Sequence, residues 1–313
     1  MTEMVWSIVL LAAGFILLIK GADFFVEGSS SVAKTLKVPS IIIGLTIVAM
    51  GTSLPECAVS ITAAMGENNA LAVSNAVGSN IFNLMVVCGF AALFNPLKAE
   101  KSTLKKEFPF SILCAVLLLV CGFLSMELGR ADGLILLAIF VGFLVWMVRS
   151  ALRARAQAGE EEYEVLPMWK CVVFIVGGVI AIKFGGDFVV DGASAIAARL
   201  GLSENLIGLT IVACGTSLPE LVTSVVAAKK NELDMALGNV IGSNIFNILF
   251  VLGVAAAISP IAFIMENVVD IGILIAMSVV AWLFTATRQK LERSEGALML
   301  LIYAGYLVYI CTR

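Results

Sequence analysis

A thirteen-residue stretch that occurs twice constrains the fold of this chain more than any other feature. Residues 44–56 read GLTIVAMGTSLPE and residues 208–220 read GLTIVACGTSLPE, identical at 12 of 13 positions. A second motif, GSNIFN, follows each copy at residues 78–83 and 242–247, again with an offset of 164 residues. Because both pairs keep this offset, the chain contains an ungapped internal duplication, and its fold must be built from two related halves.

The composition indicates a membrane protein. Hydrophobic residues make up 60% of the 313 residues and charged residues 14%, and the mean hydropathy is +1.04. A soluble domain is typically about 45–50% apolar and about 25% charged, and runs of about 20 apolar residues, enough to cross a bilayer, recur along this chain. We therefore expect a multi-pass protein surrounded by the lipid bilayer, with no nucleic-acid partner and no cofactor.

The apolar runs predict an all-α polytopic protein with ten transmembrane helices. A linker, residues 151–167, separates a first repeat, residues 1–150, from a second, residues 168–313. Each repeat holds five spans, and this odd number makes the second repeat enter the membrane from the opposite side, as in the inverted repeats of secondary transporters. The predicted spans lie near residues 4–33, 40–65, 71–94, 108–126, 131–149, 168–197, 204–228, 236–258, 268–286 and 296–312.

Basic residues predict the orientation in the membrane. The loops after the odd-numbered spans, together with the start of span 6, hold 15 Lys and Arg residues, whereas the opposite side holds 3. Cytoplasmic loops carry an excess of positive charge, so the side with 15 basic residues is predicted to be cytoplasmic. The chain is therefore expected in the cell membrane with both termini outside the cytoplasm.

The duplicated motif predicts that helices 2 and 7 are broken within the membrane. Pro55 has no N–H and clashes with the carbonyl one turn earlier, and the carbonyls between Ala49 and Thr52 are expected to lose their helical partners. Such backbone is tolerated at membrane depth where it lines a cavity, and freed carbonyls are ready cation ligands. The two copies add side-chain oxygens within about one helical turn, from Thr52, Ser53, Glu56, Thr216, Ser217 and Glu220.

The GSNIFN motifs supply further oxygen ligands. Ser79 and Asn83 are four residues apart, and so are Ser243 and Asn247, a spacing that places each pair on one helix face. Carboxylate, hydroxyl, amide and carbonyl oxygens suit hard cations, and Ca2+ takes about 6–8 of them in flexible geometry. The chain has no histidine, so imidazole ligands and imidazole proton relays are excluded.

Two glutamates carry the charge of the predicted site. Glu56 and Glu220 occupy equivalent positions of the two halves, so we expect them at similar depth and close to one another. Two carboxylates balance one divalent cation, which favours Ca2+, although the residues alone leave other ions open. Asn80 and Asn244 point to another helix face, where packing, a backbone hydrogen bond and ion ligation are all open.

Charged residues also lie inside spans 1 and 6. Lys20 precedes Asp23 by three residues and Lys183 precedes Asp187 by four. Side chains at these spacings pair on one helix face. We predict two such pairs, and the alternative is that these residues line an entry path for ions.

The four motif segments resemble the paired alpha-repeat signatures of the sodium/calcium exchanger family, within the calcium/cation antiporters. The resemblance extends over the whole chain, and the short linker is similar to that of prokaryotic members. It implies that Na+ and Ca2+ are the transported substrates, exchanged by alternating access while spans 1 and 6 slide or rock against the core. It also implies a transporter rather than an enzyme.

The resemblance implies a role for each site residue. Glu56 and Glu220 would be shared by Ca2+ and Na+, and the other oxygen ligands would be the backbone carbonyls of Ala49, Thr52, Ala213 and Thr216, the hydroxyls of Thr216, Ser53, Ser217, Ser79 and Ser243, and the amides of Asn83 and Asn247. Several relatives carry Asp at the position of Asn247. With two site carboxylates in place of three, this chain is not expected to co-transport K+.

Three other functions are open from the sequence. In a Ca2+/H+ antiporter the two glutamates would exchange protons for the ion, since buried carboxylates can titrate near neutral pH. An intramembrane hydrolase would pair Ser53 or Ser217 with Lys20 or Lys183, although one nucleophile needs no mirrored copy. A channel is the third, but an inverted two-fold build suits alternating access better.

Overall fold

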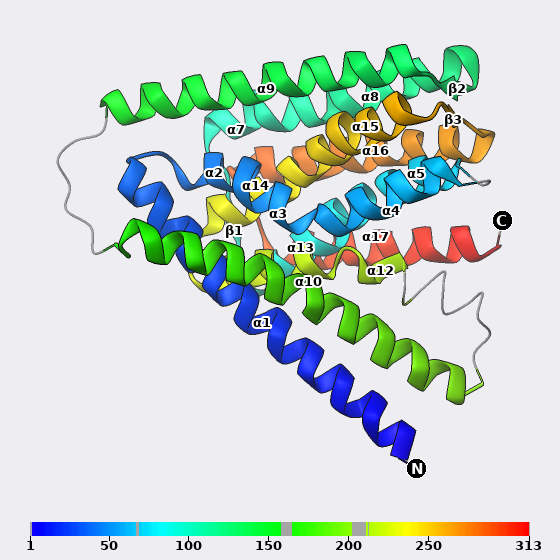
Figure 1. Ribbon diagram of the computed structural model, residues 1–313. Coiled ribbons are helices and arrows are strands. Elements are labelled where there is room, and N and C mark those ends of the chain that lie inside the picture. Colours follow the sequence, from blue (N-terminus) through cyan, green and yellow to red (C-terminus); the bar gives the residue numbers. More distant parts are fainter. Residues whose placement is uncertain (1, 67–68, 158–164, 202–210, 212, 313) are drawn as a thin grey trace.

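The computed structural model describes residues 2–66, 69–157, 165–201, 211 and 213–312, and helices make up most of it (Figure 1). In chain order, with π-helical turns labelled η, the elements are α1 (Thr2–Leu36), α2 (Ser40–Ile43), η1 (Gly44–Val48), α3 (Ala49–Thr52), α4 (Leu54–Met65), α5 (Leu71–Phe82), η2 (Asn83–Val87), α6 (Cys88–Phe94), β1 (Leu97–Lys98), α7 (Lys101–Lys105), α8 (Glu107–Ser125), β2 (Glu127–Leu128), α9 (Arg130–Gln157), α10 (Met168–Arg199), α12 (Ala213–Gly215), α13 (Leu218–Lys229), α14 (Leu233–Phe246), η4 (Asn247–Val251), α15 (Leu252–Ile258), β3 (Ile261–Ala262), α16 (Met265–Arg288), β4 (Lys290–Leu291) and α17 (Arg293–Thr312).

The all-helical membrane fold is confirmed. Within the described ranges, eight helices are long and apolar enough to cross a bilayer. The number of spans is nine if the bent pair, Ser40–Thr52 with Leu54–Met65, is counted as one span. These nine coincide with predicted spans, although α9 continues to Gln157, beyond its predicted end at residue 149. The remaining span, predicted near residues 204–228, begins outside the described residues. Residues 158–164 of the predicted linker also lie outside them.

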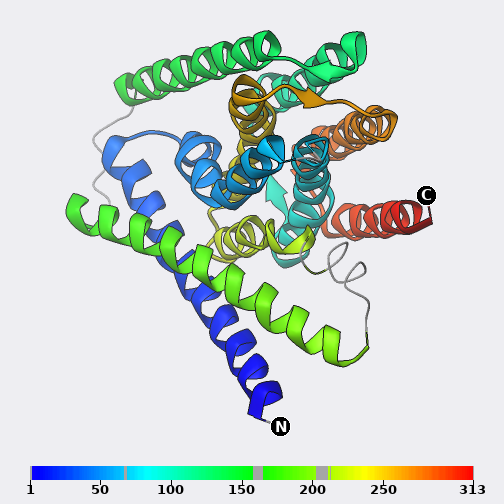
Figure 2. The same ribbon diagram turned by 45° about the vertical axis from the view of Figure 1, so that its right-hand side comes forward.

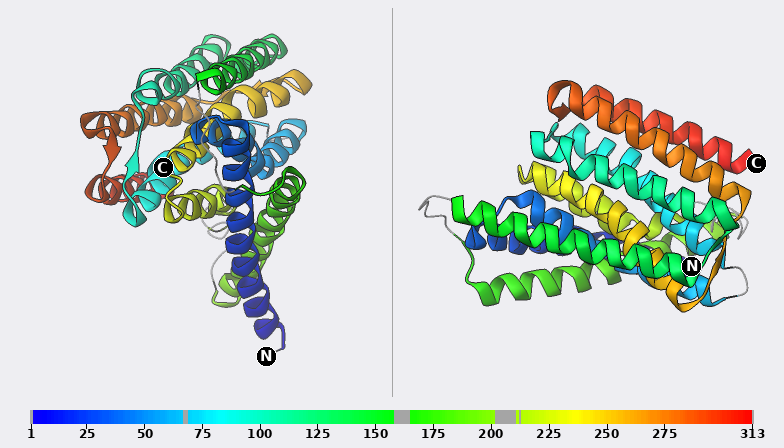
Figure 3. Two further views of the ribbon diagram at one scale, coloured as in Figure 1. Left: turned by 90° about the vertical axis from the view of Figure 1, so that its left-hand side faces the viewer. Right: turned by 90° about the horizontal axis from the view of Figure 1, so that it is seen from above.

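Two spans form the centre of the molecule. Within the apolar windows of Leu71–Phe94 and Leu233–Ile258, 78% of the residues are buried, compared with 22% for Met4–Leu36 and 17% for Arg293–Thr312. Figure 2 and Figure 3 show the two spans among the other helices, with α9 and α17 at the periphery. The GSNIFN motifs, which lie in these two spans, are therefore in the protein interior.

Helices α1 and α10 form an antiparallel pair that extends away from the other helices (Figure 1, Figure 3). Their backbones touch at glycines. A Cβ atom added to Gly14 would lie 2.8 Å from the carbonyl oxygen of Gly185, and one added to Gly178 would lie 2.8 Å from that of Gly21. Small residues allow this close approach in membranes, so a larger side chain at these positions would push the two helices apart.

Two short strand pairs join the two halves of the chain. Strand β1 pairs antiparallel with β4, and β2 pairs antiparallel with β3. Each pair therefore connects a loop of the first half to a loop of the second. No sequence pattern predicts them, because two residues are too few to show the alternation of a strand.

The helix that carries the first duplicated motif is bent by 51°, as predicted. The bend lies at Ser53, with φ −87° and ψ 14°, and Pro55 sits in the first turn of α4, where a missing N–H costs no hydrogen bond. The predicted loss of the helical partner of Ala49 is wrong, since its carbonyl accepts a bond from the Ser53 N–H at 3.1 Å. The break is therefore narrower than the proline alone suggests.

Candidate ion-binding site

The two broken helices each place one glutamate in the interior. Glu56 lies in the first turn of α4 and Glu220 in the first turn of α13, and neither is exposed. Ser217, the residue before α13, has φ −94° and ψ 7°, nearly the geometry of Ser53. The N-terminal end of a helix carries partial positive charge, so both turns favour a carboxylate.

Each glutamate accepts a hydrogen bond from the serine of the other half. The Ser53 hydroxyl donates to Glu220 Oε1 at 2.7 Å, and the Ser217 hydroxyl donates to Glu56 Oε1 at 3.1 Å. Each serine precedes the glutamate of its own helix by three residues, so these crossed bonds bring the two carboxyl groups together, close enough for their charges to interact. Glu56 and Glu220 therefore lie close to one another, as the duplication predicts.

Two asparagines lie on the central spans, in turns that contact the helices of the two glutamates: η2 contacts α13 and η4 contacts α4. Asn83 begins η2 and Asn247 begins η4, and both are fully buried. Ser79 and Ser243 lie one turn earlier on α5 and α14 and are also buried. Single π-helical turns occur often at functional sites, and here they widen the helix where the amide side chains turn inward.

Buried oxygens without hydrogen-bond partners are concentrated among the predicted ligands. Within the part of the chain that the structure describes, ten buried side-chain oxygens lack a partner, and six of them belong to predicted site residues. The six are Glu56 Oε2, Glu220 Oε2, Asn83 Oδ1, Asn247 Oδ1, Thr216 Oγ1 and Ser243 Oγ. Buried polar groups are normally bonded, and unpartnered acceptors that cluster call for a donor or a cation.

The remaining predicted ligands lie beside these carboxyl groups or in the same turns. The Thr52 hydroxyl bonds to the Ala49 carbonyl at 3.3 Å and to Asn239 Oδ1 at 3.2 Å. Thr216 lies next to the Glu56 carboxyl. Ala213, whose backbone carbonyl is a predicted ligand, is the first residue of α12. The structure thus brings the first copy of the duplicated motif and the described part of the second, residues 213–220, to one region.

Asn80 and Asn244, whose role the sequence leaves open, bond to one another's backbone. Asn80 Nδ2 donates to the Asn244 carbonyl at 3.1 Å, and Asn244 Nδ2 donates to the Asn80 carbonyl at 3.2 Å. Their side-chain oxygens accept hydrogen bonds from the site asparagines. Asn247 Nδ2 donates to Asn80 Oδ1 at 3.0 Å, and Asn83 Nδ2 donates to Asn244 Oδ1 at 3.3 Å. The four amides therefore form one network across the two halves.

A further pair of contacts was not predicted from the sequence. Asn75 Nδ2 donates to the Ser60 hydroxyl at 2.9 Å, and Asn239 Nδ2 donates to the Ser224 hydroxyl at 2.9 Å. The signal was present, because Asn239 and Ser224 lie 164 residues after Asn75 and Ser60. The offset of the duplication therefore marks the four residues as two sets of equivalent polar positions.

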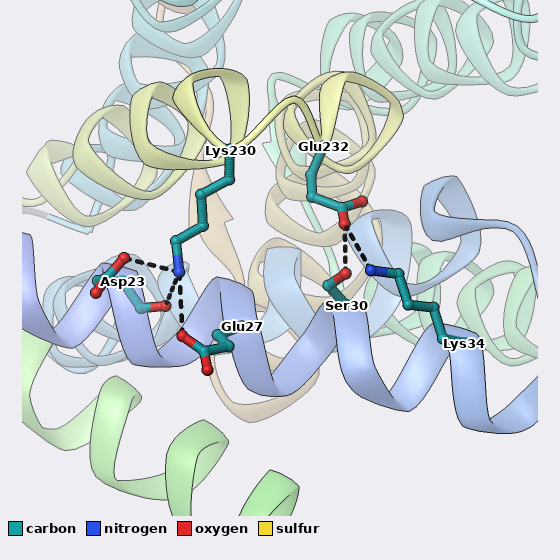
Figure 4. Close-up of polar contacts among 6 residues, drawn as sticks. All are labelled: Asp23, Glu27, Ser30, Lys34, Lys230 and Glu232. Carbon is teal, nitrogen blue, oxygen red and sulfur yellow. Dashed lines mark hydrogen bonds and ion pairs between the residues drawn. The ribbon is translucent and has the colours of Figure 1, made fainter. Parts of the chain in front are cut away.

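A charged cleft of about 690 Å3 lies apart from these residues, between α1 and the turn that joins α13 to α14. Figure 4 shows Lys230 reaching Asp23 at 2.7 Å and Glu27 at 3.3 Å. Glu232 accepts a bond from Ser30 and lies 3.8 Å from Lys34. Each charged side chain drawn there lies within 3.8 Å of an oppositely charged one from another helix or turn, with Lys230 shared by two carboxylates.

This cleft corrects one sequence prediction. Asp23 pairs with Lys230 of the other half, in place of the predicted partner Lys20 on the same helix. The within-helix pair of Lys183 and Asp187 is confirmed, and both side chains are about half exposed. The hydrolase hypothesis loses its support, since among the described contacts Ser53 and Ser217 donate to glutamates rather than to a lysine.

Comparison with known proteins identifies the family. The family model described as sodium/calcium exchanger protein matches residues 6–149 and 170–312. The chain belongs to the sodium/calcium exchanger family. The two matched segments follow the division into halves and cover both copies of each duplicated motif.

Relatives of this exchanger-family chain match over nearly its whole length. A putative antiporter, CaxA, from Alkalimonas amylolytica is 41% identical over 97% of this chain and 98% of its own. The sodium/calcium exchanger MaX1 from Methanosarcina acetivorans is 31% identical over 97% of this chain and 98% of its own. A solved structure of the sodium-calcium exchanger NCX_Mj superposes with a TM-score of 0.85 at 34% identity, covering 97% of this chain and 99% of that one.

Proposed function

We propose that this protein is a secondary antiporter that exchanges Na+ for Ca2+ across the membrane. The observation that carries the proposal is the pair of buried, crossed glutamates, each with one oxygen that has no partner among the described residues. Two carboxylates surrounded by hydroxyl and amide oxygens match the charge and the ligand chemistry of Ca2+. Within the described residues, no ion pair to Lys or Arg neutralises either glutamate.

The ligands are assigned as the family resemblance implies. Glu56 and Glu220 serve both ions, and the backbone carbonyls of Thr52 and Thr216 complete the Ca2+ site. The flanking Na+ sites use the Ala49 and Ala213 carbonyls and the hydroxyls of Thr216, Ser53, Ser217, Ser79 and Ser243, with Asn83 and Asn247 lining the centre. Because both ions draw on the same two carboxylates, occupancy by Na+ would displace Ca2+, which is the condition for exchange.

We further propose that residues 1–150 and 168–313 are inverted repeats of five spans each. Contacts that come in mirrored pairs support this, among them the two crossed serine–glutamate bonds and the two asparagine–serine bonds. A site between inverted repeats can open to either side when one part rocks against the other. The antiparallel α1–α10 pair, with its glycine contacts, is the natural moving part.

The proposed orientation places both termini outside the cytoplasm. Arg155 and Glu127 are exposed, and they lie on opposite sides in this topology. In a variant without the seven native cysteines, Arg155→Cys should be protected from an impermeant thiol reagent in intact cells, whereas Glu127→Cys should be labelled. The reverse pattern would overturn the orientation and leave the ion site untouched.

The alternative coupling ion is H+. It is favoured by the same unpartnered oxygens, Glu56 Oε2 and Glu220 Oε2, which could each carry a proton when no cation is bound. Proteoliposomes loaded with Na+ and diluted into Na+-free buffer, with pH clamped on both sides, separate the two. Na+ coupling predicts rapid uptake of calcium-45, and H+ coupling predicts uptake only when a pH gradient replaces the Na+ gradient.

A further inference from the structure

The amides of Asn80 and Asn244 can take only one orientation. Each Nδ2 lies at 3.1–3.2 Å from the backbone carbonyl of the other residue, and a carbonyl oxygen can only accept. The NH2 group of each side chain must therefore face that carbonyl, and its Oδ1 must face the opposite way. The two residues are buried, with exposures of 0% and 2%, so water offers no alternative partner.

The orientation of these two amides determines the orientation of the amides of the two site asparagines, Asn247 and Asn83. Asn80 Oδ1 lies 3.0 Å from the amide nitrogen of Asn247, and Asn244 Oδ1 lies 3.3 Å from that of Asn83. Because Oδ1 can only accept, Asn247 and Asn83 must present their NH2 groups there. Their own Oδ1 atoms then point away from the network, and both are buried without a partner among the described residues.

We propose that Asn80 and Asn244 are positioning residues that decide which end of Asn247 and Asn83 meets the transported cation. The inference rests on the proposed function, since it assigns those two Oδ1 atoms to the ion. A flipped Asn247 would set its NH2 group, which repels a cation, into the site and leave Oδ1 facing Oδ1 at Asn80. The selectivity of the site for a cation is thus built one layer behind the ligands.

The pairing is crossed, and this gives the proposal a specific signature. Asn80 of the first half acts on Asn247 of the second, and Asn244 acts on Asn83. A purely structural brace between Asn80 and Asn244 would show no such preference. Outer residues that orient a metal ligand typically contribute about 10–100-fold to metal affinity, so Asn80→Ala should weaken Ca2+ binding by about that factor.

The test is a double-mutant cycle on equilibrium binding of calcium-45 to the purified full-length protein. Asn80→Ala added to Asn247→Ala should weaken binding little further, because its target is gone, whereas added to Asn83→Ala it should weaken binding by its full factor. The mirrored cycle, Asn244→Ala with Asn83→Ala or Asn247→Ala, should give the mirrored result. Asn80→Ser is the milder second variant, with the same expectation.

Asn267→Ala is the matched control, since Asn267 is a fully buried asparagine that bonds Ser74 at 2.9 Å, away from the site. It should lower thermal stability and leave Ca2+ affinity unchanged. Equal losses for Asn80→Ala in both backgrounds would overturn the positioning role while leaving the proposed function in place. Absence of Ca2+ binding by the wild-type protein would overturn the proposed function itself.

Discussion

The central site and the charged cleft both contain acidic residues, buried in the site and partly exposed in the cleft, and the two regions compensate these charges in opposite ways. In the cleft, Lys230 contacts Asp23 and Glu27 directly. In the site, the side-chain bonds that Glu56 and Glu220 accept from described residues come from serine hydroxyls, and each glutamate keeps one oxygen without a partner among those residues. An uncompensated buried charge is costly, so in the proposed function a cation completes the site, whereas in the cleft lysines already contact the acidic side chains.

The two regions also differ in symmetry. The crossed serine–glutamate bonds and the asparagine–serine bonds of the site each have a counterpart 164 residues away, whereas Lys230 and Glu232 correspond to Gly66 and Asn68, which carry no charge. A site between two related halves can serve both membrane faces, while a contact without a counterpart can act at one face alone. The charged cleft therefore joins α1 to the second half on one side of the molecule.

The largest effect is expected from the site glutamates. Glu56→Gln and Glu220→Gln should each reduce Ca2+ uptake by about two orders of magnitude or more, because the number of charged ligands tunes Ca2+ affinity over that range. Thermal stability without Ca2+ should not fall, since no Lys or Arg of the described residues loses an ion pair. The control is Glu27→Gln in the cleft, the same change at a paired residue. Near-normal flux in either site variant would remove that glutamate from the site.

An intermediate effect is expected from the crossed serines. Ser53→Ala and Ser217→Ala each remove a hydrogen bond to a carboxyl group, worth about 1.5–3 kcal/mol, so Ca2+ affinity should fall by about 10–100-fold. Because the two bonds are mirrored, the two losses should agree within a small factor. Ser30→Ala, which removes a serine bond to Glu232 in the cleft, serves as the control. A loss at only one of the two site serines would show that the halves contribute unequally.

A smaller effect is expected from Lys230→Gln. The substitution removes the contacts of Lys230 with Asp23 and Glu27, and partly exposed pairs of this kind contribute about 0–1 kcal/mol each. The transport rate should change by less than about tenfold, and the change should shrink at high salt because screening weakens the pair in the wild type. Equilibrium Ca2+ affinity should stay as it was. A shift in affinity equal to the shift in rate would contradict the separation of cleft and site.

The smallest effect is expected from Asp187→Asn. Asp187 is the counterpart of Asp23 in the second half, but it pairs with Lys183 on its own helix and both side chains are about half exposed. Such a pair contributes about 0.3–0.5 kcal/mol, so flux and thermal stability should be close to those of the wild type. Asp23→Asn is the matched comparison and should have the larger effect. Equal effects at both positions would remove the asymmetry argued from the cleft.

The sequence predicted the helices and the motif residues because both leave local signals. Apolar runs define spans, and Glu56 and Glu220 stand out as charges inside them. The contacts could not be predicted in the same way. That Ser53 bonds Glu220 and not Glu56 depends on how the two halves pack, and the conformation at Ser53 preserves a helical bond that the proline was expected to break.

The partner of Asp23 shows the same limit. Helical spacing predicts pairing within a helix, and at Lys183 and Asp187 that prediction holds. At Asp23 a lysine from a distant turn competes for the same carboxylate, and its closer approach decides the outcome. The two-residue strands that join the halves leave no periodic signal at all. Local spacing thus predicts which residues could pair within a helix, and tertiary packing determines which pairs form.

The central claim is that Na+ and Ca2+ share the crossed glutamates, and competition at equilibrium tests it most directly. Purified protein is loaded with calcium-45, and the bound fraction is measured against increasing Na+, with K+ replacing Na+ at constant ionic strength. The account predicts that Na+ displaces Ca2+ while K+ does not, and that Glu56→Gln and Glu220→Gln bind little calcium-45 in either salt. Displacement that is equal in Na+ and K+, or Ca2+ binding that survives both substitutions, would contradict the account.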